Sequence, residues 1–432
     1  MEIAVQDFRN TVDEMEKEIA LCRRKHDDEM AGKLSVNLKR YRCAKEDNYG
    51  KKSLISFLVR NNVLPKYGFP VDTVELIPEI DKVGRDKSLQ LARDLQMAIA
   101  EYAPGAEVVA DGKMYVSRYI RKIPGKNGNS VWEEGRYCIK CPNCGQPNFT
   151  KEPALSGSRE CVSCHKPISK FSWRKTLEPR MGFCAEKDAR EVPLHRPEHD
   201  YKTDDYYIGD SYRNIISERR FQVRGQTLRL ESTSNDSLVV IGQTRYKVCS
   251  TCGYACENEI PLNHKNVQGY PCKNKDGKAS EYYLSHDFKT DVVKITFETQ
   301  EASDRNTMLS VMYALLEGLS REMGIERTDI KGCLFSTMVE GKMVDSIILY
   351  DAVAGGAGHV RRMVTESGDA FQRVLARAIL VVDGCDCGSS CYKCLRNYYN
   401  QKIHDRLNRR SASEFLHQWL GQMEEIPKMM FP

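Results

Sequence analysis

Cysteine spacing is the feature that most constrains this chain. The sequence contains 17 cysteines, and most of them stand in CxxC or CxC pairs. The chain begins MEIAVQDFRN and lacks the basic-then-apolar layout of a secretory signal. Paired cysteines in a reducing compartment indicate metal ligation rather than disulfide bonds. The sequence therefore predicts a cytoplasmic protein with several modules that are each built around a metal ion.

The first cysteine group has the spacing of a zinc ribbon. Gly145 follows the first CxxC knuckle and allows the backbone to curl around the ion. Cys138 lies three residues before this knuckle and offers an alternative register. The predicted ligands of this group, site 1, are Cys141, Cys144, Cys161 and Cys164.

The second group, site 2, contains three cysteines at ligand spacing and leaves the fourth ligand open. His264 would complete a Cys3His site and is the preferred fourth ligand, whereas Cys256 is its rival. A three-ligand site open to water is a further alternative, and His264 could also be an ordinary surface histidine. The three thiolates are Cys249, Cys252 and Cys272.

The third group, site 3, places four cysteines within ten residues, which is too tight for a disulfide framework and suits one tetrahedral zinc. Its ligands are Cys385, Cys387, Cys391 and Cys394. Four protein ligands close each site to water, so about three Zn²⁺ ions are expected to be structural. Structural zinc supplies on the order of 10 kcal/mol of folding free energy.

The segment YKCLRNYYNQKIHDRLNRR predicts a basic helix that starts on site 3. Tyr398 and Tyr399 are interleaved with its cationic residues, a mixture that suits phosphate contact and base stacking. A solvated charged face is the alternative interpretation. The candidate nucleic-acid-binding residues are Arg396, Lys402, Arg406, Arg409 and Arg410.

The order of patterns along the chain predicts a multi-domain α+β fold. A helical N-terminal part precedes a β-rich zinc-ribbon middle and an α/β C-terminal zinc-binding domain. Helices are expected at KKSLISFLVRN, DKSLQLARDLQMAIAEY, residues 304–323 and FQRVLARAILVV, and strands at TVELI and SIILYDAV. The predicted segments are a helical arm at 1–48, a small α/β segment at 49–135, a zinc ribbon at 136–180, a β-rich segment at 181–280 and a zinc-binding domain at 281–432.

Motifs for nucleotide hydrolysis are missing from these 432 residues. No GxxxxGK[ST] loop and no convincing acidic helicase box occurs, which predicts a protein that is not itself an enzyme. No stretch approaches the ~18 apolar residues that a membrane helix needs. The net charge of +5 suits a polyanionic partner without proving one.

A glycine-rich turn, LYDAVAGGAGHV, follows a predicted buried strand. Its notable residues are Asp351, Gly355, Gly356 and His359. A nuclease or another hydrolase is one interpretation, in which Asp351 and His359 form a catalytic pair together with Asp291. A turn that merely needs small residues is the commoner explanation.

Three motifs occur in the order SHDFKTDVVKI, LYDAVAGGAGHV and CDCGSSCYKCLRNYYNQ. In this order they resemble the MrfA-type zinc-binding domain, over about residues 280–410. Upstream, SLISFLVRNNVLPKYGFPVDTVEL and the two earlier cysteine groups look like the segment that precedes this domain in large bacterial superfamily-two DEAD/DEAH helicases. These helicases act in DNA repair and antiviral defence.

The resemblance implies a module that binds zinc through the four cysteines of site 3 and works with a helicase motor on DNA. The motor is expected to be a separately encoded DEAD/DEAH subunit, as in the DISARM defence system, or the chain is a fragment of a longer enzyme. The leading hypothesis is thus a DNA-binding helicase partner in antiviral defence or DNA repair, with no membrane partner. A hydrolase at the glycine turn and a protein-only scaffold are the alternatives.

Overall fold

The computed structural model describes most of the chain from residue 73 onward. The described residues are 73–78, 89, 91–124, 130–131, 136–151, 159–168, 173–192, 203–209, 215–274, 277–365, 369–421 and 423–426, with scattered positions between 13 and 38. The helix predicted at KKSLISFLVRN and most of the predicted N-terminal arm lie outside them. Within the arm, the described positions are helical, and Ile19, Leu34 and Leu38 pack together with Cys22.

A long antiparallel hairpin forms the spine of the molecule. Strand β16 (Gln226–Cys249) pairs with β18 (Ala279–Glu298) from Thr227 opposite Glu298 to Cys249 opposite Ala279. Two register shifts interrupt the pairing, which is typical of β-bulges that bend and twist a long strand. Because the strands are so long, one hairpin contributes to two separate hydrophobic cores.

The hairpin lies within an eleven-stranded mixed sheet whose main path runs β21-β15-β16-β18-β11-β7-β8. Strands β14 and β17 pair with β16, and the β19–β20 hairpin pairs with β18. The other strands of this sheet are β7 (Tyr137–Lys140), β8 (Pro147–Thr150), β11 (Arg174–Leu177), β14 (Thr203–Tyr207), β15 (Ile215–Val223), β17 (Ala255–Cys256), β19 (Ile330–Val339), β20 (Lys342–Asp351) and β21 (Glu424–Glu425).

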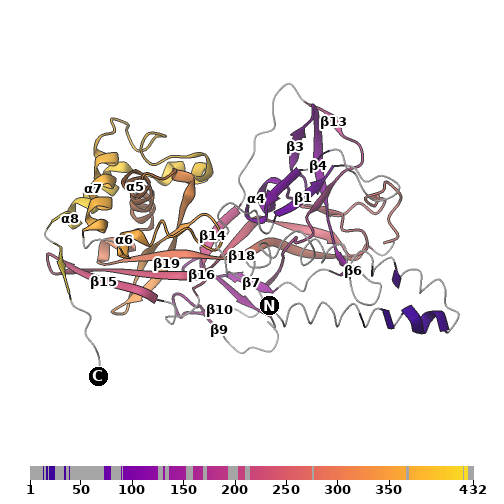
Figure 1. Cartoon of the computed structure of the whole chain (residues 1–432), viewed down its shortest axis with the longest axis horizontal. Coiled ribbons are helices and arrows are strands. Elements are labelled where there is room, and N and C mark those ends of the chain that lie inside the picture. The colour runs from indigo at the N-terminus through magenta and orange to yellow at the C-terminus, as the bar shows by residue number, and fades with distance from the viewer. Residues whose placement is uncertain are drawn as a thin grey trace.

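A helical lobe covers one end of this sheet (Figure 1). It contains α5 (Arg305–Met323), α6 (Arg362–Thr365), α7 (Ala370–Asp383) and α8 (Arg409–Trp419), and three short 3-10 helices lie in the same half of the chain: η2 (Gln300–Ser303), η3 (Arg327–Asp329) and η4 (Tyr398–Arg406). The Asp304 carboxylate caps α5 by accepting from two backbone N–H groups, and Gly324 ends the helix in the left-handed conformation.

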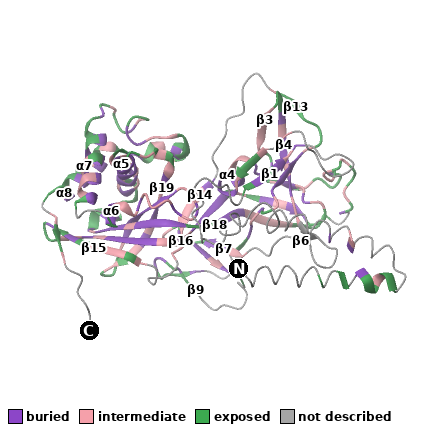
Figure 2. Cartoon of the chain, in the orientation of Figure 1, coloured by how far each residue is buried: buried purple, intermediate pink, exposed green. Residues whose placement is uncertain are grey.

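Glycine at position 318 lets α5 and α7 approach each other closely. A Cβ atom there would lie 2.6 Å from the Val374 carbonyl oxygen. The helices bury their apolar faces against alternate residues of the hairpin, including Leu228, Val293 and Phe297. These side chains are buried. Figure 2 shows much of α5 in purple, the colour of buried residues.

A six-stranded sheet packs on the other half of the hairpin, at the opposite end of the molecule (Figure 1). Its elements are β1 (Thr73–Ile77), β2 (Leu91–Asp94), α4 (Leu95–Glu101), β3 (Glu107–Ala110), β4 (Lys113–Ile120), β12 (Phe183–Ala185) and β13 (Arg190–Glu191). Two small hairpins complete the described strands: β5 (Ile123–Pro124) with β6 (Ser130–Val131), and β9 (Arg159–Glu160) with β10 (Pro167–Ile168).

Two helix predictions need correction. The helix expected over DKSLQLARDLQMAIAEY is shorter, because Leu91–Asp94 pairs with β1 and Asp94 then caps α4 by accepting from the Gln96 N–H. The basic helix expected after site 3 is two helices. Asn397 caps η4 and Asn408 caps α8, so each asparagine starts a new helix.

The predicted α+β class is confirmed, with more sheet than helix among the described residues. The predicted strands at TVELI and SIILYDAV correspond to β1 and β20, and the two C-terminal helix predictions to α5 and α7. The bounds of the five predicted segments stay predictions, and the β16–β18 hairpin crosses the boundary at residue 280. A search of the described helices finds none with the length and apolarity to span a membrane.

Candidate zinc centres

The structure brings the twelve predicted ligands together in three groups of four. In each group the ligand atoms all lie within 4.8 Å of one another. A zinc tetrahedron with Zn–S bonds of about 2.3 Å has S···S edges of about 3.8 Å. The Cys141–Cys164 and Cys144–Cys161 sulfurs of site 1 are both 3.6 Å apart. A disulfide would need about 2.05 Å, so the spacing fits zinc.

The other two sites have the same edge lengths. In site 2 the Cys249 and Cys272 sulfurs are 3.8 Å apart. In site 3 the Cys385–Cys391 and Cys387–Cys394 distances are 3.5 Å and 3.7 Å. The prediction of about three structural zinc ions is confirmed by these donor sets, and the assignment of individual ligands is the arrangement that we propose.

A shared backbone turn builds the knuckles of sites 1 and 2. The residue after each CxxC pair donates its N–H to the carbonyl of the first cysteine: Gly145 to Cys141, His165 to Cys161 and Gly253 to Cys249, at 2.8, 3.0 and 3.1 Å. All three donors have positive φ values, of 74°, 56° and 79°. This left-handed turn favours glycine, so only His165 adopts it with a side chain.

Two buried asparagines, which the sequence analysis missed, support sites 1 and 2. The Asn148 side-chain amide donates to the Cys161 sulfur at 3.5 Å, and its oxygen accepts from the Val162 N–H. The Asn274 side chain likewise donates to the Cys249 sulfur, at 3.2 Å. Both asparagines lie close in sequence to ligand cysteines, which is the only signal that could have indicated them. Such supporting groups orient metal ligands.

These donors change the acidity of the ligand thiols. Burial raises the pKa of Cys161. The backbone N–H groups of Cys164 and Ser163 and the Asn148 side chain together lower it by more than burial raises it, so the pKa is about 7, below the usual value of a thiol. At Cys249 the opposing effects of burial and of donors that include Asn274 leave the pKa at about 6. One thiol in each of these sites is therefore prepared to lose its proton and bind zinc.

The structure places His264, and not Cys256, at site 2. The His264 Nε2 atom lies 3.3 Å from the Cys252 sulfur, and its Nδ1 atom faces the Pro261 carbonyl at 2.7 Å. The carbonyl contact orients the ring so that Nε2 faces the ion. Cys256 instead donates to the Asn258 carbonyl. Cys138, the alternative in site 1, lies buried in β7, where burial raises its pKa to about 12.

Site 3 is joined to the hydrophobic core of the helical lobe. It lies between α7, which ends at Asp383, and α8, which starts at Arg409. Cys385 and Cys394 belong to the core cluster of buried residues. The Arg409 guanidinium donates to the Cys387 and Val382 carbonyls at 2.7 Å and 3.2 Å, so it ties α8 to the site. This structural role was missed by the sequence analysis.

Four of the five cations predicted to bind nucleic acid form hydrogen bonds or an ion pair within the chain. Arg396 donates to the Ser390 hydroxyl, and Lys402 forms an ion pair with Asp204. Arg406 donates to the Asn306 side chain, and Arg409 holds the carbonyls named above. Only the exposed Arg410 side chain makes no hydrogen bond or ion pair with a described residue.

The predicted functional turn is held by a buried carboxylate. Asp351 accepts backbone N–H groups of Ala357, His359 and Val360 at 2.6, 3.1 and 3.0 Å. Among described residues, no hydrogen bond joins the Asp351 carboxylate to the His359 ring. A Cβ at Gly356, whose φ is 75°, would lie 2.4 Å from the Asp291 Cγ atom. The turn therefore needs its glycine and its aspartate for structure.

Comparison with known proteins places these sites in context. The family model for the MrfA Zn-binding domain matches residues 311–395. Druantia protein DruE from Escherichia coli (strain UMEA 4076-1) is 22% identical over 428 residues, and the alignment covers 89% of this chain and 22% of DruE. The chain thus spans about a fifth of that relative's length.

Two solved structures of the DUF1998 helicase MrfA are also similar to the chain. The structure bound to DNA has a TM-score of 0.38 and 11% sequence identity, and covers 80% of this chain and 34% of that chain. The structure bound to DNA and AMPPNP has a TM-score of 0.32 and 9% identity, and covers 80% and 31%.

These findings confirm the resemblance to the MrfA-type zinc-binding domain, and the matched range contains all four cysteines of site 3. They correct the prediction that the chain is not an enzyme. That prediction is wrong because it took the absence of hydrolysis motifs from a chain that spans only 22% of its relative DruE as evidence about activity. The absence of a GxxxxGK[ST] loop from these residues therefore does not show that the chain is not an enzyme.

Proposed function

We propose that this chain, which contains a match to the MrfA Zn-binding domain, forms the zinc-built region that holds DNA for a DEAD/DEAH-type helicase motor in antiviral defence or DNA repair. The motor's nucleotide-binding motifs are encoded outside these 432 residues. The region acts in the cytoplasm, where reducing conditions keep the ligand thiols available to zinc.

The observation that carries the proposal is the position of site 3. Its four cysteines lie inside residues 311–395, which match a zinc-binding domain named after the helicase MrfA. The similarity to the Druantia protein DruE supports a role in defence. Because two of the site 3 cysteines belong to the core cluster, zinc fixes the surface of the helical lobe as well as its fold.

Exposed side chains around site 3 suit a DNA strand. Tyr392 and Lys393 are the two residues between Cys391 and Cys394, and both are exposed. Tyr398 and Tyr399 are also exposed and pack edge to face, with ring centroids 5.5 Å apart. Lys393 and Arg410 make no ion pair with a described residue, so they are the cations most available to phosphate. Aromatic rings beside cations are the usual means of binding single strands.

The test is a binding titration of the purified, zinc-quantified chain with short single-stranded and double-stranded DNA across a salt series, followed by fluorescence anisotropy. We expect binding without added nucleotide, with an affinity that falls as salt rises because each phosphate contact releases counterions. Absence of binding at low salt, in a chain that carries about three zinc ions, would overturn the proposal.

A further inference from the structure

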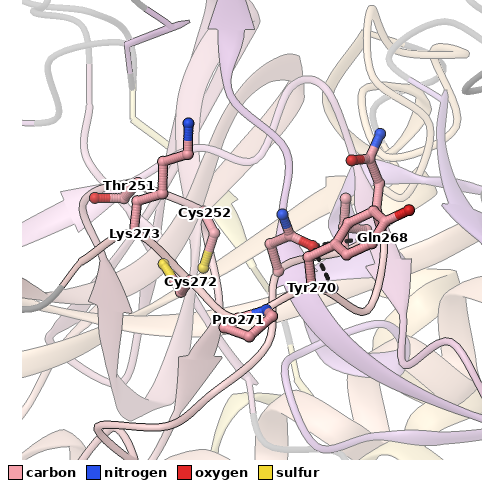
Figure 3. A pocket seen from close by; sticks show the side chains of 9 residues that line it. Thr251, Cys252, Gln268, Tyr270, Pro271, Cys272 and Lys273 are labelled. Carbon is pink, nitrogen blue, oxygen red and sulfur yellow. Dashed lines mark hydrogen bonds between the residues drawn. The ribbon is translucent and has the colours of Figure 1, made fainter.

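A hollow of about 500 Å³ lies beside site 2, at the end of the long hairpin, and the contacts described so far give it no role. Figure 3 shows the Cys252 and Cys272 side chains on one side of it and Tyr270 with Gln268 on the other. Its lining residues are Thr251, Cys252, Asn266, Val267, Gln268, Tyr270, Pro271, Cys272 and Lys273. Two of these are ligands of the zinc, so the ion fixes one wall of the hollow.

The loop that forms the other wall is held in one conformation. The Asn266 side-chain oxygen accepts the backbone N–H groups of Gln268 and Tyr270, at 3.0 Å and 3.1 Å. Lys265 forms a β-bridge with Pro271. The Tyr119 hydroxyl, from strand β4, donates to the Lys265 carbonyl at 3.1 Å. The Tyr270 ring is thus presented by a rigid loop, although 59% of the residue is exposed. An aromatic ring held in water by a rigid loop is suited to binding.

One lysine, Lys273, lines the hollow, and a second, Lys265, lies on the same loop. None of its lining residues is acidic. Lys265 and Lys273 are exposed and make no ion pair with a described residue. The exposed Glu259, on the chain between two zinc ligands, is paired with Lys247. A polyanion can therefore approach the hollow without meeting an unpaired carboxylate from its lining.

We propose that this hollow is a second contact for single-stranded DNA, in which one unpaired base stacks on Tyr270. The Gln268 side-chain amide lies beside the ring and can hydrogen-bond the edge of that base, and Lys265 and Lys273 attract the flanking phosphates. A paired base cannot offer its face to a single ring at a loop tip, so the hollow selects single strands. This inference rests on the proposed function, because it needs a chain that binds DNA.

The experiment uses the zinc-loaded full chain and an oligonucleotide that contains 2-aminopurine, whose fluorescence is quenched by stacking. We expect Tyr270→Ala to lower the affinity for the single strand about tenfold and to remove the quenching. Its affinity for duplex DNA should stay within about twofold of wild type, and its zinc content should be unchanged. Tyr270→Phe keeps the stacking face and should bind as wild type does.

Leu262→Ala is the matched control, since Leu262 is exposed on the same zinc loop and does not line the hollow. It should leave both affinities unchanged. If wild type binds DNA and Tyr270→Ala binds it equally well, the hollow is not a DNA contact, the inference is wrong and the proposed function stands. An equal loss in Tyr270→Phe would also overturn base stacking. A wild-type chain that binds no DNA would overturn both proposals.

Discussion

Sites 2 and 3 hold their ligands in the same tetrahedral arrangement but lie in opposite surroundings. Site 3 is continuous with the core of the helical lobe, which contains Cys385 and Cys394. Site 2 lies at the end of the β16–β18 hairpin, beside the open hollow. Zinc at site 3 therefore stabilises a domain, whereas zinc at site 2 stabilises a loop. A group of four zinc ligands is thus joined to a hydrophobic core in one place and to an exposed loop in another.

The largest expected effect is the loss of site 3. Cys394→Ser removes a ligand that is 2% exposed, so the variant should lose one zinc per chain and more than about 4 kcal/mol of unfolding free energy. Metal analysis and urea unfolding measure the two quantities. Cys184→Ser is the control, because this buried cysteine belongs to none of the three groups and its loss should leave all zinc in place.

Asp351→Asn should have the next largest effect on stability. The amide keeps the shape of the carboxylate but loses its charge and one accepting oxygen, while the three backbone N–H groups stay in place. Hydrogen bonds to a charged group are worth about 1.5–3 kcal/mol, so we expect a loss of this size in urea unfolding. Unchanged stability together with loss of a nuclease activity would instead support the catalytic alternative at this turn.

Cys272→Ser tests the other side of the comparison. The variant should lose one zinc, as Cys394→Ser does, but its unfolding midpoint should stay close to that of wild type because site 2 lies outside the two large cores. The change should be confined to the loop at 262–274, where limited proteolysis would detect it. Equal losses of stability in the two cysteine variants would contradict the contrast between the sites.

The smallest effect concerns the cations near site 3. Replacing both Lys393 and Arg410 by alanine should leave zinc content and stability unchanged, because neither side chain makes an ion pair with a described residue. If both side chains contact phosphate, the slope of log Kd against log salt concentration should decrease in magnitude by about one for each residue replaced. Arg396→Ala, whose guanidinium contacts Ser390, serves for comparison. An unaltered slope would show that Lys393 and Arg410 do not contact the phosphates of DNA.

Local spacing allowed the sequence to predict much of the sites. CxxC and CxC pairs fix the distance between their sulfurs through two or three peptide units, so the donor groups could be named before their geometry was known. The His264 ring, the preferred fourth donor, lies with the three thiols of site 2, whereas Cys256 donates to the Asn258 carbonyl. The roles of Asn148, Asn274 and Arg409 depend on side chains that meet only after folding.

Tertiary contacts also explain what the helix predictions missed. Leu91–Asp94 has helical periodicity but pairs with β1, because strand pairing overrides a weak local preference. The polar YKCLRNYYNQKIHDRLNRR segment has few apolar residues to favour one continuous helix, and the caps at Asn397 and Asn408 divide it. Those caps could have been read from the sequence, since asparagine is a preferred N-cap residue.

Hydrogen–deuterium exchange of the zinc-loaded chain, with and without a single-stranded oligonucleotide, tests whether the surfaces at sites 2 and 3 both contact DNA. We expect DNA to slow exchange in the loop at 262–274 and around residues 391–400, and to leave exchange in the buried helix α5 unchanged. Unchanged exchange in both surfaces, at an oligonucleotide concentration that saturates binding, would contradict the claim that these zinc sites hold DNA.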